Sequence, residues 1–241
     1  PTFLWGAAAT APDAGPAPKA ALDAEAAARG HLRDLAPTYR TTAAEIDALP
    51  VTSIQRMDNG GALVRLAGAV DGIEVFREGF NVLLARDGAL LAIGGFAQGA
   101  PAGARKSAFD APLSAADAAA AALADFGFAA DVAARFVRTD AEGGYVRLAL
   151  PERTVGGDDT TLTDATRAKR VWFRLGSQLV PAWYVEVRAR AGQERRREHY
   201  AYVVSAVDGS LLFRKSQIAH QSFGYRVFAE PQPPHLPYPT P

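Results

Sequence analysis

The sequence has 241 residues and a mass of 25.4 kDa, and its 26 lysines and arginines balance its 26 aspartates and glutamates. Proteins that bind nucleic acids or anionic membrane surfaces usually carry a basic excess, so neither partner is expected. Because there is no cysteine, disulfides, thiolate nucleophiles and cysteine-bound metals are excluded. The length suffices for one or two domains with a buried core. No apolar run reaches the roughly 20 residues of a membrane-spanning helix.

The first part of the chain combines an irregular segment with helical patterns. Residues 1–30 are expected to be irregular and to include the start of a helix that runs from Ala20 to about Leu35. Thr41 or Thr42 together with Glu45 forms a capping-box pattern. It predicts a second, short helix that ends before Pro50.

From Val51 the apolar pattern changes to a period of two, which indicates strands. Turn signals at 58–61, 71–72 and 86–88 predict an antiparallel meander over residues 51–95. Its expected strands are 51–56, 63–66, 73–76, 80–84 and 90–93.

A second helix and a second strand set follow a Gly/Pro/Ala-rich linker over 97–112. Ser114 and Asp117 form a capping box, and the helix from Ala115 to about Phe126 is expected to stop at Gly127. Residues 151–168 are interpreted as a polar excursion and 190–198 as a charged hairpin loop. The expected strands are 134–138, 145–150, 170–175, 179–188, 199–204 and 210–213. The fold class is therefore α+β, with antiparallel sheets that each have helices packed on one face.

Side chains that carry chemistry are sparse. The four histidines, His31, His199, His220 and His235, form no zinc motif, and no serine lies in a Gly-x-Ser-x-Gly elbow. The loop 156–159 is interpreted as a polar turn rather than a metal site. Because no nucleophile, base or metal ligands converge, catalysis within this chain is not expected.

Several single residues have competing interpretations. Trp172, Trp183 and Tyr184 are expected in the core, and His199 at an edge or on the surface. The run Arg195–Arg197 is expected to be a solvated hairpin tip. The alternatives for that run are a patch that docks a partner and a nick site for a trypsin-like protease.

The stretch from Leu63 to Gly95, with its Gly72-Ile-Glu-Val-Phe76 segment, resembles the fungalysin/thermolysin propeptide motif. Ala67 stands where that family usually has glutamine. The second half is similar to a PepSY module in the helix 113–126, the segment 179–187 and the closing hairpin 201–212. Ser205 replaces the aspartate that is common there, whereas Asp208 and Gly209 keep the turn.

The tail Phe223–Pro231 resembles the first strand of a mature fungalysin-type peptidase. These resemblances together imply two cystatin-like or PepSY-like modules in the pro-region of a secreted zinc metallopeptidase. The implied division is an N-terminal segment over 1–30, a propeptide-like module over 31–96, the linker 97–112, a PepSY-like module over 113–218 and a pro/mature junction with the first peptidase strand over 219–241.

The resemblance implies that the chain helps the peptidase domain to fold and inhibits it until the junction is cut. The expected cleavage lies within Ala219, His220, Gln221, Ser222, Phe223 and Gly224. Partner-contacting candidates are Arg195, Arg196, Arg197, Gln217 and Ile218. The chain itself is expected to hold no cofactor, the implied zinc belongs to the attached peptidase, and His220 is a weak zinc-ligand candidate.

The implied location is outside the cell, with a signal peptide already removed. The competing hypothesis is a free-standing PepSY-type binding module, secreted or periplasmic and unconnected to a protease. What the gene encodes after Pro241 separates the two hypotheses.

Overall fold

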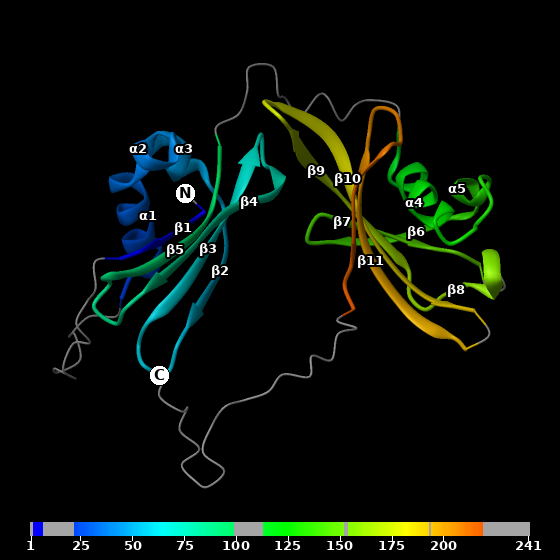
Figure 1. Cartoon of the computed structure of the whole chain (residues 1–241), viewed down its shortest axis with the longest axis horizontal. Coiled ribbons are helices and arrows are strands. Elements are labelled where there is room, and N and C mark those ends of the chain that lie inside the picture. Colours follow the sequence, from blue (N-terminus) through cyan, green and yellow to red (C-terminus); the bar gives the residue numbers. More distant parts are fainter. Residues whose placement is uncertain (1, 7–21, 99–112, 152–153, 193, 219–241) are drawn as a thin grey trace, which may run out of the picture.

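The computed structural model describes residues 2–6, 22–98, 113–151, 154–192 and 194–218. It shows an α+β protein, as expected from the sequence, in which one large, mostly antiparallel sheet is accompanied by few helices. The separate sheets that were expected are joined into one. The helices lie on the outer sides of the molecule and the strands lie between them (Figure 1). The helical elements are α1 (Ala24–Asp34), α2 (Ala36–Tyr39), α3 (Ala43–Ala48), α4 (Ala115–Ala124), α5 (Val132–Arg135) and the 3₁₀ turn η2 (Gly157–Asp159).

The N-terminal helices pack on a five-stranded antiparallel part of the sheet. Its strands are β1 (Phe3–Trp5), β2 (Val51–Arg56), β3 (Ala62–Val70), β4 (Ile73–Leu84) and β5 (Leu90–Phe96). Alternate residues of β3 and β4 are buried, as expected for strands with one covered face. Leu32 of α1, Ile46 of α3 and Phe80 of β4 lie in this first apolar core.

The C-terminal strands form the rest of the sheet, and α4 and α5 cover one of its faces (Figure 1). They are β6 (Val137–Glu142), β7 (Tyr145–Ala149), β8 (Thr161–Leu162), β9 (Thr166–Leu175), β10 (Gln178–Ala191), β11 (Arg196–Ser205) and β12 (Leu211–Ser216). Leu123 of α4 packs with Val185 and Tyr202 in a second apolar core. The opposite face of these strands is the open face.

A long-range pairing joins the two groups of strands. β4 lies beside β9 in parallel, with Val75 opposite Trp172. Trp172 is buried, and its indole nitrogen donates to the carbonyl oxygen of Val70 at 3.2 Å. Glu78 of β4 binds Arg174 of β9, and Lys169 binds Glu74 at 2.5 Å.

Both capping boxes are confirmed. Thr42 caps α3 with Glu45, and Ser114 caps α4 with Asp117. Gly127 follows α4 with a φ of 69°, a conformation in which glycine avoids the strain of a side chain. Trp172 and Trp183 are buried, as expected, whereas Tyr184, expected with them in the core, is only partly buried.

Four expectations about strands were wrong. The N-terminal segment, expected to be irregular, contributes strand β1, which pairs with β5. The separate strands 73–76 and 80–84 are one strand, β4, which continues through a distortion with positive φ at Arg77 and Gly79. Residues 132–135 form the helix α5 instead of the start of a strand, which fits the helix propensity of Ala133 and Ala134. The polar excursion 151–168 contains η2, β8 and the beginning of β9.

Candidate functional site

The run Arg195–Arg197, a candidate from the sequence, is divided between the β10–β11 turn and strand β11. Arg195 lies in the β10–β11 turn with a φ of 54°. β11 already begins at Arg196, so the loop expected over 190–198 is shorter than predicted. Because successive side chains of a strand point to opposite faces, Arg196 and Arg197 reach two different pockets.

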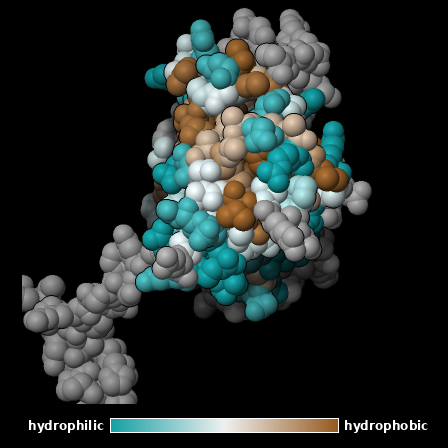
Figure 2. Space-filling view, turned by 90° about the vertical axis from the view of Figure 1, so that its right-hand side faces the viewer, coloured by the Kyte–Doolittle hydropathy of each residue, from teal (hydrophilic) through white to brown (hydrophobic). Residues whose placement is uncertain are grey.

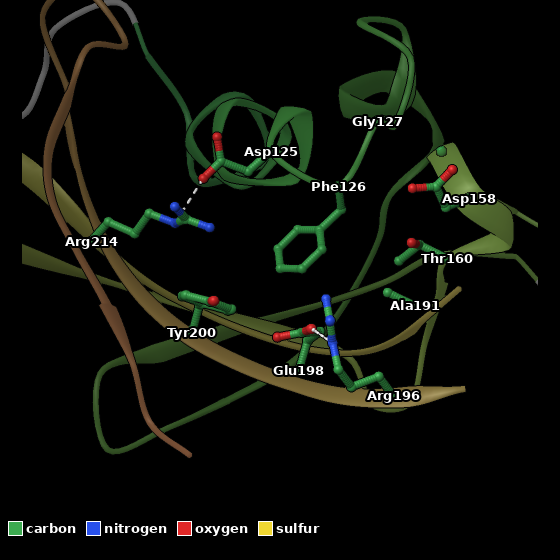
Figure 3. A pocket seen from close by; sticks show the side chains of 11 residues that line it. Asp125, Phe126, Gly127, Asp158, Thr160, Ala191, Arg196, Glu198, Tyr200 and Arg214 are labelled. Carbon is green, nitrogen blue, oxygen red and sulfur yellow. Dashed lines mark hydrogen bonds and ion pairs between the residues drawn. The ribbon is translucent and has the colours of Figure 1, made fainter. Parts of the chain in front are cut away.

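Arg196 lines a pocket of about 330 Å³ on the helix-covered side (Figure 3). The end of α4, the loop around η2 and the ends of β10, β11 and β12 meet there. Phe126 and Tyr200 meet edge to face in its wall, with 5.9 Å between ring centroids. The remaining lining residues are Asp125, Gly127, Gly157, Asp158, Thr160, Ala191, Glu198 and Arg214.

Both arginines of this first pocket are paired with a carboxylate, and Asp158 is the remaining charged residue of the lining. Arg214 lies 3.0 Å from the carboxylate of Asp125, which also accepts a hydrogen bond from the Tyr202 hydroxyl at 3.1 Å. Burial raises the pKa of Tyr202, so this hydroxyl stays protonated as a donor. Arg196 donates to Glu198 at 2.6 Å (Figure 3). Such mutual pairing supports local structure, and it presents no activated nucleophile or base.

Arg197 lines a second pocket, of about 350 Å³, on the open face. The side chain of Ile218 reaches the same pocket, because the chain continues along β11 beyond β12 and the Gln217 amide donates to the His199 carbonyl oxygen at 2.7 Å. The structure therefore brings two of the predicted partner-contacting residues, Arg197 and Ile218, together. The other lining residues are Thr163, Arg188, Ala189, Arg190, Glu198 and His199.

Cations dominate the open face around this second pocket. Arg188 and Arg147 share the carboxylate of Asp164, at 3.5 and 3.1 Å. Arg190 and Arg197 lie directly opposite each other on β10 and β11, and both are exposed. Neither has a carboxylate partner among the residues that the structure describes.

His199 lines the same pocket and lies directly opposite Arg188 in the strand ladder. It is half-buried rather than at a surface edge, so that expectation needs correction. Burial lowers the pKa of His199, and the nearby charge of Arg188 lowers the pKa further. Its Nε2 atom is buried with no hydrogen-bond partner in the described structure. The imidazole is therefore held in its neutral form near pH 7.

The remaining predicted residues are not brought into either pocket. Gln217 is exposed at the sheet edge, and Ala219–Gly224, His220 included, lie outside the described residues. The loop 156–159 folds as the η2 turn. Within the part of the chain that the structure describes, no group of three or more histidines and carboxylates converges to hold a metal. No described helix is long and apolar enough to cross a bilayer.

The side of the molecule that carries α4 and α5 shows no concentrated apolar surface among its described residues. In Figure 2, brown apolar side chains alternate with teal polar ones over the coloured part of this face. The charged open face is therefore the more distinctive surface. Sequence reasoning did not identify Arg188 and Arg190, although their spacing of two within a strand could have revealed them.

Comparisons with known proteins leave the family open. No family model and no curated protein matches the sequence. A solved structure, the Bacillus megaterium YpeB C-terminal domain, aligns with 9% sequence identity and a TM-score of 0.29. The alignment covers 80% of this chain and 63% of that chain.

Proposed function

We propose that this chain is the pro-region of a secreted, fungalysin-type zinc metalloendopeptidase. In this role it assists folding of the peptidase domain and inhibits that domain until the chain is cut within residues 219–224. The partner is the cognate catalytic domain, which supplies the zinc. Slow folding behind a high barrier is the physical reason why such a protease benefits from a segment that binds its native-like state.

The observation that carries the proposal is the position of β12 at an edge of the sheet. β12 is the last strand in the hydrogen-bonded order of the described sheet. From there the chain continues along β11 to Gln217 and Ile218, directly before the proposed junction. A strand at a sheet edge can pair with a segment of another domain through its backbone groups. The junction and a binding edge would thus be adjacent.

The folding of the stretch that resembles a propeptide gives further support. Leu63–Gly95 lies within three consecutive antiparallel strands, β3, β4 and β5, with turns at the positions of its Asp-Gly pairs. The finer part of the fold proposal is that residues 31–96 and 113–218 are two PepSY-like modules. Their separate apolar cores are consistent with that division.

The test is to express the precursor and to determine the N-terminus of the mature protein. The coding region after Pro241 is read first, and it should encode a peptidase with a zinc-binding helix. The mature N-terminus should then fall between residues 219 and 226. A stop codon after Pro241 would instead favour the free-standing binding module, and a mature N-terminus far from this interval would refute the junction.

A further inference from the structure

We infer that the cationic end of the open face binds an acidic, extended segment of a partner protein. The site consists of Arg188, Arg190 and Arg197, around the second pocket. This inference does not depend on the proposed function, because it concerns the chemistry of the ligand and not the identity of the partner.

Two like charges lie side by side at this site. Arg190 and Arg197 occupy directly opposite positions in the antiparallel ladder, where side chains are about 5 Å apart at Cβ. Like charges at such positions destabilise a sheet. Four cations on the neighbouring strands, Arg147, Arg167, Lys169 and Arg188, each lie beside a carboxylate. An external anion would relieve the repulsion that Arg190 and Arg197 retain.

The spacing of the cations also fits an extended ligand. Arg188 shares Asp164 at 3.5 Å, whereas Arg190 has no carboxylate partner among the described residues. They are two residues apart on β10, which places them on one face about 7 Å apart. An extended peptide with a carboxylate on every second residue repeats at the same distance. Guanidinium groups bind carboxylates through two parallel hydrogen bonds, which favours this pairing in orientation as well as in charge.

The charge pattern favours a protein segment over a nucleic acid. The whole chain has no basic excess, whereas binding to a phosphate backbone normally draws on one. The chain's own C-terminal stretch does not supply the ligand, because residues 219–241 contain a single carboxylate, Glu230.

The experiment measures fluorescence anisotropy of a labelled peptide of alternating glutamate and threonine, titrated with the full chain. The same peptide with glutamine in place of glutamate is the ligand control. The test variant is Arg190→Gln with Arg197→Gln, which removes two exposed cations and relieves their repulsion. The charge-matched control is Arg86→Gln with Arg138→Gln, at exposed positions in the β4–β5 turn and on β6.

We expect the test variant to bind the acidic peptide at least about fivefold more weakly than the wild type, and the control variant within about twofold. Equal binding of the glutamine peptide, or equal losses in the two variants, would overturn the inference. Tighter binding of a single-stranded DNA of the same charge would also overturn it, in favour of a nucleic-acid ligand. Absence of an attached peptidase affects none of these outcomes.

Discussion

Glu78 on β4 and Arg174 on β9 form a largely buried ion pair across the junction of the two strand groups. Glu78 also accepts a hydrogen bond from the backbone N–H of Gln98 at 3.1 Å. With Lys169–Glu74 and the indole of Trp172, this pair holds together segments about 95 residues apart in sequence. Removing one member of a buried ion pair leaves an uncompensated buried charge and destabilises the protein. Replacing both members by apolar residues often costs little stability.

Arg174→Met should therefore lower the free energy of unfolding by about 3 kcal/mol. The double change Glu78→Met with Arg174→Met should recover most of that loss, as measured by urea denaturation. Arg33→Met breaks the exposed pair with Asp47 and should cost less than about 1 kcal/mol. A cost of Arg174→Met no greater than that of Arg33→Met would contradict the account of the junction.

Tyr202→Phe removes the hydroxyl that donates to Asp125 and keeps the buried ring. It should lower the unfolding free energy by about 1.5–3 kcal/mol, because one hydrogen bond to a charged acceptor is lost. Tyr200→Phe, in the wall of the same pocket, should stay within about 0.5 kcal/mol of the wild type. Equal effects of the two changes in thermal or urea unfolding would argue against the role of Asp125.

The stability of the protein should depend on pH through His199. Its pKa is lowered in the folded state, so the unfolded chain takes up the proton first as the pH falls. The contribution of the neutral imidazole is thus complete above about pH 6.5 and is lost as the pH falls through the folded pKa. His199→Gln should flatten the dependence of the unfolding free energy between pH 7.5 and 5.5. If the slope of the unfolding free energy against pH is unchanged in this variant, groups other than His199 cause the pH dependence.

The turn between β11 and β12 should show a strongly acidic carboxyl group. Hydrogen bonds from the hydroxyls of Ser205 and Ser210, and from the Ser210 amide, lower the pKa of Asp208 to about 2. Carbon-detected NMR titration should find this midpoint, and Ser210→Ala should move it upward, because that change removes one of the donors. A midpoint near that of an ordinary aspartate would mean that the turn is not formed in solution.

The pattern of residues was sufficient to predict the capping boxes, the turns and the α+β class, because these features depend on residues that are neighbours in the sequence. It was insufficient for the joining of β4 to β9, which depends on contacts such as Val75 with Trp172 that local periodicity does not encode. The open face was missed for a similar reason. Arg188 and Arg190 become a site only when the register places Arg197 opposite Arg190. The start of β11 at Arg196 decides which arginine reaches which pocket.

The most direct test of the pro-region proposal is inhibition in trans. Purified residues 1–222 are added to the mature peptidase encoded downstream, and hydrolysis of a peptide substrate is followed. The proposal predicts inhibition at about micromolar concentration, with a heat-denatured sample of the same segment as the inactive control. Full peptidase activity at tens of micromolar of the folded segment would contradict the proposal.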